Sequence, residues 1–399
     1  MTRTRSSRLV ASLVAFGLVA AACGGDDDDA TPDDEPASEP ADEPADEPAD
    51  EPAEALDVDL ASVCPSPLVI QTDWFPESEH GALYQMVGDG YSIDADNLTV
   101  TGPLWASGPT PTGIDIEVRT GGPAIGFSPP RVQMYTDDSI HIGYSTLDQQ
   151  AVQWNDLPLV SVMAPLEINP QIIMWDPEVY PEIETIADLG EAGVTINVFG
   201  GGGFSDYFVA AGVWSADQVD PSYDGQPGRF IAEGDIAQQG FASAEPYNYE
   251  FVFEEYGKPV AFQTLHDAGY QTYSQTLGVK PTELENLRPC LEKFIPIVQQ
   301  SVVDFAADPA RATATIIDAV ETFDAGWVYN EGVAEYAVAT MTELGLHGNG
   351  PDDIIGNLDE TRIQKVIDDA KLAGLDVPDD LVAADMFTNE FIDPTIGFG

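Results

Sequence analysis

Short apolar runs rich in β-branched residues recur along the first half of the chain, and helical or Gly/Pro-rich stretches separate them. Such runs predict strands, because β-branched side chains fit the pleated surface of a sheet. The six runs are residues 68–71, 114–118, 140–143, 159–162, 172–174 and 194–198. Strands that alternate with helices in this way indicate an α/β fold.

The last third of the chain has a different pattern, in which apolar residues recur three and four positions apart. This spacing places them on one face of a helix. The three predicted faces are Phe294, Val298, Val302 and Phe305, then Val333, Tyr336, Ala337, Met341 and Leu344, and then Ile363, Val366, Ile367 and Ala370. Gly374 is a plausible stop for the last helix. We therefore expect a helix-rich C-terminal part that packs back on the α/β part.

The N-terminus has the pattern of a secretory signal peptide over residues 1–22. Arg3, Arg5 and Arg8 precede an apolar run that ends in small residues and is too short to span a bilayer as a mature helix. Cys23 follows directly, an arrangement that resembles the bacterial lipobox and predicts a lipidated cysteine (palmitate being one acyl group). The alternative is an ordinary signal peptide with an incidental cysteine. We expect a protein held by its N-terminal lipid on the extracytoplasmic face of the cell membrane.

Residues 23–55 form an acidic linker in which four aspartates precede a Pro-Ala-Asp-Glu repeat. This composition cannot bury enough apolar surface to offset the entropy of ordering the chain, so it predicts disorder. Proline and like charges both extend such a segment. We interpret it as a spacer between the anchor and the folded body, and an acidic binding tail is the alternative.

The charge balance excludes one class of partner. The chain has 70 Asp and Glu against 14 Lys and Arg, a formal net charge of −56, and about 15 of the acids lie in the linker. A nucleic-acid-binding protein needs a basic face, which this composition does not supply. An acidic body is typical of adaptation to salty surroundings, and a cationic ligand is the other interpretation.

With Cys23 assigned to the lipid, Cys64 and Cys290 remain. Two cysteines in an exported protein favour a disulfide over two free thiols.

The segment after the first predicted strand has the strongest functional pattern. Trp74, Phe75 and Pro76 form a turn at the carboxyl end of that strand, and His80 and Tyr84 follow. Open α/β sheets bind ligands at this end of their strands. The segment resembles the opening motif of the NMT1/THI5-like (SsuA/THI5-like) solute-binding proteins. The alternative is that Trp74 and Tyr84 are core aromatics.

Three further segments carry the resemblance. Residues 188–196 are similar to the family's entry to its second lobe, and residues 200–208 are similar to its glycine loop and helix start. Residues 244–250, with Glu245 and Tyr247, are similar to a segment near the return to the first lobe, and residues 388–392 resemble the C-terminal ending. Backbone N–H groups in a glycine loop suit anions or polar ring edges.

The resemblance implies a periplasmic-binding-protein fold of type II, with the ligand in a cleft between two lobes. Lobe 1 would comprise residues 66–155 plus 265–399, and lobe 2 residues 156–264. It implies a monomeric solute-binding lipoprotein that works with an ABC permease and its ATPase, with a pyrimidine or thiamine-precursor-like heterocycle as ligand. The expected ligand-binding residues are Trp74, Phe75, His80, Ser145, Gly201, Gly202, Gly203, Tyr207, Glu245 and Tyr247.

Residues 121–126 and 144–150 match the family's first-lobe loops only loosely, so the ligand stays open. Ser145 and Asp148 could face the cleft, but a turn at a strand end would look the same. A sulfonate or nitrate-type oxoanion is the alternative ligand, with Arg119 and Arg131 as its partners. An envelope sensor or partner-binding protein is the alternative function, since fold does not fix function.

An enzyme is not expected. The four histidines stand at 80, 141, 266 and 347, and the chain has no zinc-protease, P-loop or nucleophile-elbow motif. No metal site or cofactor is predicted.

Overall fold

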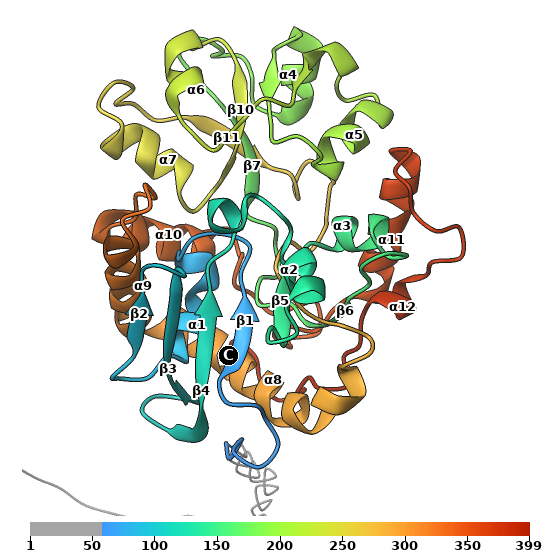
Figure 1. Cartoon of the computed structure of the whole chain (residues 1–399). Helices are drawn as coiled ribbons and strands as arrows, with labels where there is room; N and C mark the ends of the chain where they lie inside the picture. The colour runs from blue at the N-terminus through green and yellow to red at the C-terminus, as the bar shows by residue number, and fades with distance from the viewer. Residues whose placement is uncertain (1–57) are drawn as a thin grey trace, which may run out of the picture. The chain divides into compact units, whose positions relative to one another are not determined.

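The computed structural model describes residues 58–399, which belong to one folded unit. The predicted signal peptide, Cys23 and almost all of the acidic linker therefore lie outside the described residues. Within residues 58–399 the chain forms two sheets surrounded by helices (Figure 1). This arrangement confirms the predicted α/β fold.

The larger sheet has seven strands and forms the centre of lobe 1. Their order is β2 (Ser92–Asp94), β3 (Thr99–Trp105), β4 (Pro111–Arg119), β1 (Leu68–Gln71), β5 (Ile142–Ser145), β12 (Thr276–Val279) and β6 (Val160–Met163). β1 pairs in parallel with β4 and β5, whereas the pairs toward both edges are antiparallel. Every residue of β1, β5 and β12 is buried, because the sheet is covered on both faces.

The smaller sheet has five strands and forms the centre of lobe 2. Their order is β11 (Ala261–Thr264), β7 (Gln171–Trp175), β10 (Ala237–Phe241), β8 (Ile196–Asn197) and β9 (Val219–Asp220). The helices that connect its strands are α4 (Ile186–Ala192), α5 (Gly203–Ala210), α6 (Gly228–Glu233) and α7 (Glu245–Tyr247). In Figure 1 this sheet and its helices occupy the upper part of the drawing.

The C-terminal part is helical, as the periodicity predicts. It comprises α8 (Leu284–Ala307), α9 (Ala310–Phe323), α10 (Glu331–Glu343), α11 (Glu360–Leu372) and α12 (Ala383–Met386). Phe294, Val298, Val302 and Phe305 of α8 are all buried in the core of lobe 1. Three shorter helices complete this lobe: α1 (Gly81–Gln85), α2 (Pro130–Thr136) and α3 (Leu147–Val152).

Two crossing segments connect the lobes, residues 164–170 between β6 and β7 and residues 265–275 between β11 and β12. The sheets thus divide the chain later than the expected boundary at residue 156. The strand expected at 159–162 forms, as β6, but it pairs with β12 in the larger sheet. Its apolar pattern predicts a strand and carries no information about which sheet receives it.

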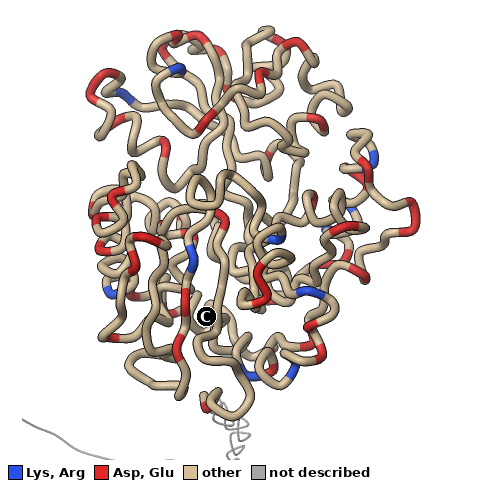
Figure 2. Tube along the Cα trace, in the orientation of Figure 1, with Lys and Arg blue, Asp and Glu red and all other residues tan. Residues whose placement is uncertain are grey.

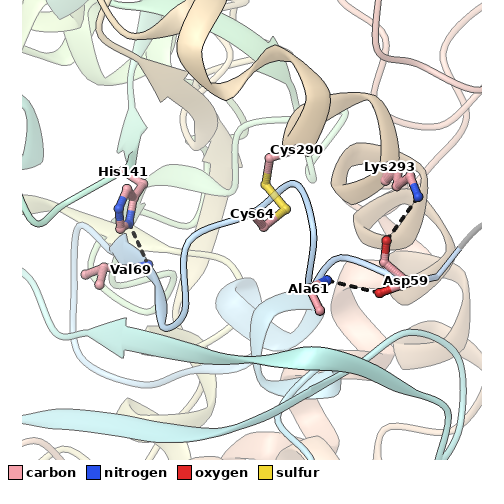
Figure 3. Close-up of a disulfide and its surroundings, with 7 residues drawn as sticks. All are labelled: Asp59, Ala61, Cys64, Val69, His141, Cys290 and Lys293. Atoms are coloured by element: carbon pink, nitrogen blue, oxygen red, sulfur yellow. Dashed lines mark hydrogen bonds between the residues drawn. A yellow bond between two sulfur atoms is a disulfide. The ribbon is translucent and has the colours of Figure 1, made fainter.

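A disulfide joins Cys64, ahead of β1, to Cys290 in α8, with 4.7 Å between the Cα atoms (Figure 3). Lys293, one turn further along α8, donates to the backbone carbonyl of Asp59 at 3.0 Å. Beside β1, His141 Nδ1 accepts a hydrogen bond from the Val69 amide at 3.0 Å. The disulfide and the Lys293 hydrogen bond attach the start of the described chain to α8.

Acidic residues predominate along both lobes of the trace in Figure 2. No helix between residues 58 and 399 is both long and apolar enough to cross a bilayer.

Candidate ligand-binding site

A cavity of about 280 Å³ is lined by residues of both lobes and of the second crossing segment. Lobe 1 contributes the ends of β1 and β5 and the starts of α2 and α3, and lobe 2 contributes the segments beside β7, β8 and β10. The residues that line it include Asp73, Trp74, Gly122, Phe127, Arg131, Ser145, Asp148, Phe199, Gly200, Gly201, Gly202, Gly203, Gln239, Phe241 and Tyr270. We call this space the main cavity. Its size suits a small molecule.

The turn after β1 presents Trp74 to the main cavity. The Trp74 carbonyl accepts hydrogen bonds from the Gly121 amide at 3.0 Å and from the Thr72 hydroxyl at 3.0 Å. Gly122 has a φ of +56°, and a Cβ on it would lie 2.5 Å from the indole ring. Only glycine accommodates both the left-handed backbone and this close approach.

Aromatic rings from both lobes surround Trp74. Its ring centroid lies 6.0 Å from that of Phe127 in lobe 1 and 6.2 Å from that of Phe199 in lobe 2. Phe127 and Phe199 are themselves 5.9 Å apart. These rings can cover a flat or apolar part of a ligand from both sides.

The glycine loop lies at the start of α5 in lobe 2. Gly201 has a φ of +83°, Gly202 is the N-cap and the helix begins at Gly203. The first amides of a helix lack intrahelical partners and attract negative or polar groups. Gly200–Gly203 line the main cavity, so the start of α5 lies beside a ligand bound there.

Lobe 1 contributes three charged groups to this cavity, Asp73, Arg131 and Asp148, and the last two are buried with unpartnered polar atoms. Arg131, at 2% exposure, donates from Nη2 to Gln149 Oε1 at 2.7 Å, and its Nε and Nη1 have no protein partner. Asp148, at 5% exposure, accepts from the Tyr270 hydroxyl at 2.8 Å, and its Oδ1 has no partner. Buried polar atoms without partners are uncommon and unfavourable, so these atoms are available to a ligand.

Burial shifts both groups toward their neutral forms. It lowers the pKa of Arg131 to about 10, although Asp148 opposes the shift, so the guanidinium stays charged at neutral pH. Burial also raises the pKa of Asp148, while the hydrogen bond from Tyr270 lowers it. The main cavity therefore offers a cationic donor and a carboxyl acceptor within one aromatic space.

A second cavity of about 70 Å³ adjoins the main cavity. The two share Asp73, Trp74, Phe199, Gln239 and Phe241, and the second is completed by Glu77, Tyr223, Gly225, Gly240, Ala244, Glu245, Gln275 and Trp327. Trp74 and Trp327 meet edge to face with 6.0 Å between ring centroids. This space, called the second cavity below, has aromatic walls and three carboxyl groups.

The solved structures that are similar to the chain in fold include the following three. The alkanesulfonate-binding protein SsuA from Xanthomonas axonopodis pv. citri, bound to MOPS, matches with a TM-score of 0.51 and 13% identity over 82% of this chain and 99% of that one. The periplasmic aliphatic sulphonate binding protein SsuA from Escherichia coli matches with a TM-score of 0.51 and 13% identity, over 84% of this chain and 95% of that one. The ligand-binding component of an ABC-type import system from Staphylococcus aureus, with zinc bound, matches with a TM-score of 0.50 and 10% identity, over 81% of this chain and 97% of that one.

The chain has the periplasmic-binding-protein fold. No protein-family model matches the sequence, and no curated protein matches it. At these identities the structural likeness establishes the fold alone, so the ligand must be argued from the residues of this chain.

In this fold the interlobe cavities contain some of the predicted ligand-binding residues and not others. Trp74, Ser145 and Gly201–Gly203 line the main cavity, and Glu245 lines the second. Of the two arginines considered for an oxoanion, Arg131 lines the main cavity. Arg119 instead pairs with Glu117 at 2.7 Å and Asp137 at 2.8 Å.

The other predicted residues lie behind the lining. The rings of Phe75 and Trp327 are stacked with centroids 6.2 Å apart, and His80 contacts Asp73 Oδ1 through Nε2 at 2.9 Å. Tyr207 packs on Tyr270 at 5.2 Å between centroids. Tyr247 packs on Phe251 and Tyr336 at 4.9 and 5.6 Å. In this structure these four residues position their neighbours and do not line either cavity.

Several lining residues were not singled out from the sequence. Asp73 directly precedes Trp74, and Phe199 directly precedes the glycine loop. These neighbouring positions in the sequence could have indicated both residues. Gln275 and Trp327 come from distant segments, and only the tertiary structure brings them to Asp73 and Trp74. Among residues 58–399, no group of three His, Cys, Asp or Glu side chains is placed to hold a metal ion.

Proposed function

We propose that the chain is an extracytoplasmic solute-binding protein of an ABC importer, which captures a small molecule between its two lobes. The observation that carries the proposal is the main cavity, whose walls come from both lobes and include buried polar atoms of Arg131 and Asp148 without protein partners. Such atoms are unfavourable in an empty site, and a ligand would satisfy them.

The fold supplies a mechanism for coupling capture to transport. A solute that contacts Trp74 in lobe 1 and Phe199 in lobe 2 stabilises the arrangement in which the lobes are close, because it binds that state better than the open one. Residues 164–170 and 265–275 absorb the movement as a hinge. The permease then distinguishes the closed, loaded protein from the open one.

The ligand we propose is a planar, nitrogen-bearing heterocycle of the pyrimidine or thiamine-precursor type. Its ring would stack against Trp74 and Phe199, an amino group would donate to Asp148, and a ring nitrogen or carbonyl would accept from Arg131. The resemblance of residues 71–84 to the NMT1/THI5-like proteins supports the same class. Ser145 and the Gly201–Gly203 amides offer further polar contacts.

A second candidate ligand is an oxoanion such as a sulfonate or nitrate. Arg131 favours it, because Nε and Nη1 of one guanidinium can both donate to an oxoanion. The amides at the start of α5 would bind the same group from lobe 2.

The N-terminal features fit this function. Lipidation at Cys23 would hold the protein on the extracytoplasmic face of the membrane, and the linker over 23–55 would let the folded body reach the permease. We propose that the body acts as a monomer, in partnership with the permease and its ATPase.

A thermal-melt screen of the purified, ligand-free protein tests the function. A solute at about 100 times its dissociation constant adds about 2.7 kcal/mol to stability, which raises the Tm by several degrees. Pyrimidines and thiamine form one arm, and sulfonates and nitrate form another. A shift with one arm supports solute capture and selects the ligand class. No shift in either arm would contradict solute capture and favour the envelope sensor or partner-binding function.

A further inference from the structure

The second cavity differs chemically from the main cavity. Its polar side chains are Asp73, Glu77, Glu245, Tyr223 and two glutamines, and neither lysine nor arginine lines it. The main cavity, in contrast, has Arg131 beside its own carboxyl groups. The second cavity thus lacks the cationic side chain that the main cavity has.

The positively chargeable group beside the carboxyl groups of the second cavity is the imidazole of His80, whose Nε2 lies 2.9 Å from Asp73 Oδ1. The ion-pair contact of Glu77, which is 5% exposed, is with His80 Nε2 at 3.9 Å. Glu245 Oε2 accepts from the Phe241 amide at 2.7 Å. Burial raises the pKa of Glu77, and the nearby Glu79, Asp73 and Glu245 raise it further. This concentration of acceptors is unfavourable without a positive group nearby.

An independent observation also points to an occupant. Gln275 lines the second cavity at 3% exposure and donates from Nε2 to both oxygens of Asp73 at 3.3 Å. Its Oε1 has no hydrogen-bond partner. This buried oxygen could accept a hydrogen bond from an N–H of a positively charged group, or its partial negative charge could attract a cation that has no N–H.

The aromatic walls suit the same group. Trp74 and Trp327 are nearly perpendicular, at 83°, and the Phe199 and Tyr223 rings lie 4.7 Å apart on the lobe 2 side. Cations bind over such faces, and tryptophan is the best of them. The volume of about 70 Å³ corresponds to roughly five water positions, room for an ammonium group with a few carbon atoms.

We propose that the second cavity is a subsite for a positively charged nitrogen, an alkylammonium or quaternary ammonium group, on the solute whose other part occupies the main cavity. Asp73, Trp74 and Phe199 line both spaces, so one molecule can extend from one to the other. The inference rests on the proposed solute-binding function. It narrows the substrate class to a molecule with a cationic end.

Choline and its uncharged carbon isostere, dimethylbutanol, test the charge preference, with tryptophan fluorescence of the full chain as the signal. Trp74 and Trp327 both line the subsite and report on its occupancy. We expect choline to bind about tenfold more tightly than the isostere, the scale of a desolvated cation–π contact. In E77Q, whose circular dichroism must match the wild type and whose Tm must not be lower, the ratio should fall at least threefold.

R119M is the control, because Arg119 lines neither cavity. It should keep the preference for choline. Equal binding of the two probes, or no saturable signal with choline up to about 10 mM, would overturn the subsite. A heterocycle or oxoanion that still raises the Tm would then leave the proposed function standing, whereas no response to any solute would overturn both.

Discussion

Arg119 and Arg131 are close in sequence, but their environments are opposite. The Arg119 guanidinium is satisfied by Glu117, Asp137 and Ser139, whereas Arg131 is buried with two nitrogen atoms unpartnered. A buried charge with unpartnered donors costs stability, and the proposed ligand contact would offset that cost.

Arg131→Met should therefore separate stability from affinity. We expect the free energy of unfolding to be unchanged or about 1 kcal/mol higher, because an apolar side chain of similar length replaces an unpaired charge. Affinity for the solute that the screen identifies should fall at least tenfold, the loss of a charged hydrogen bond being about 1.5–3 kcal/mol. Chemical denaturation and calorimetric titration measure the two quantities. Arg119→Met is the control, and equal loss of affinity in both variants would refute the role of Arg131.

Glu245 predicts a pH dependence of stability. Burial raises its pKa to about 7, although the Phe241 amide opposes the shift. Because the folded pKa lies above the ordinary value of 4.5, the stabilising contribution is complete below about pH 4.5 and is lost as the pH rises through 7. At about 1.4 kcal/mol per pH unit, the difference between 4.5 and 7 corresponds to at most about 3.5 kcal/mol.

Denaturation of the unliganded protein between pH 5 and 8 measures this effect. Glu245→Gln, whose amide oxygen can still accept from Phe241, should flatten the fall in unfolding free energy. Glu167, with a pKa also raised by burial to about 7, contributes a parallel decline that the variant retains. An unchanged slope in Glu245→Gln would contradict the assignment.

How far the site could be predicted from sequence depends on the range of the contacts. Trp74 and Gly201–Gly203 stand where a strand ends or a helix begins, and local rules identify such positions. Phe75 and Glu245 also belong to such motifs, but Glu245 lines the second cavity and Phe75 lines neither. Packing decides which way a side chain in a turn points, and a local pattern does not specify packing. The rings of Trp327 and Trp74 are in contact although the two residues are far apart in the sequence. No local sequence pattern could indicate this contact.

At the scale of elements, the segment between β4 and α2 positions the Trp74 turn. Gly122 and Gly126 are both left-handed, with φ of +56° and +64°. A Cβ on Gly122 would meet the indole of Trp74, whereas a Cβ on Gly126 would meet no atom within 4 Å. The pair separates backbone strain from contact with the site.

Gly122→Ala should displace Trp74 and lower solute affinity about tenfold or more, by loss of aromatic contact. Both substitutions place a Cβ on a left-handed backbone, which should lower the free energy of unfolding by about 1–2 kcal/mol. Gly126→Ala should nevertheless leave the affinity for the solute unchanged. Titration and denaturation of both variants give the comparison. If Gly126→Ala lowered affinity as much as Gly122→Ala, the effect would come from the backbone and not from Trp74.

Six of the twelve strands between residues 58 and 399, and the helices α8, α10 and α11, could be predicted from sequence. β1 has the bounds predicted for it, and α8 buries the predicted apolar face. The strands β2, β3, β9, β10, β11 and β12 were not predicted, because short length or the presence of Gly, Pro and polar residues weakens their signal. The lobe that receives β6 could not be predicted, since pairing with β12 depends on chain far along the sequence.

At the scale of the whole molecule, the net charge of −56 predicts a dependence on salt. Like charges repel more in the compact state than in the unfolded chain. Raising NaCl from about 0.1 to about 1 M shortens the screening length from about 10 to about 3 Å, so the Tm should rise by several degrees. Sorbitol at matched water activity controls for general solute effects. A Tm that is flat or falls with salt would show that repulsion is not limiting.

The final prediction concerns movement of the lobes. The main cavity takes its walls from both, so a bound solute is stabilised by contacts that exist only when the lobes are close. Saturating solute should therefore reduce the radius of gyration in X-ray scattering and slow hydrogen exchange in residues 164–170 and 265–275. In Arg131→Met at the same solute concentration, occupancy is lower and both changes should shrink in proportion. If the solute bound to the wild-type protein with no change in scattering or in exchange at the crossing segments, capture would occur without closure. The permease would then have to recognise the solute or the cavity rim itself.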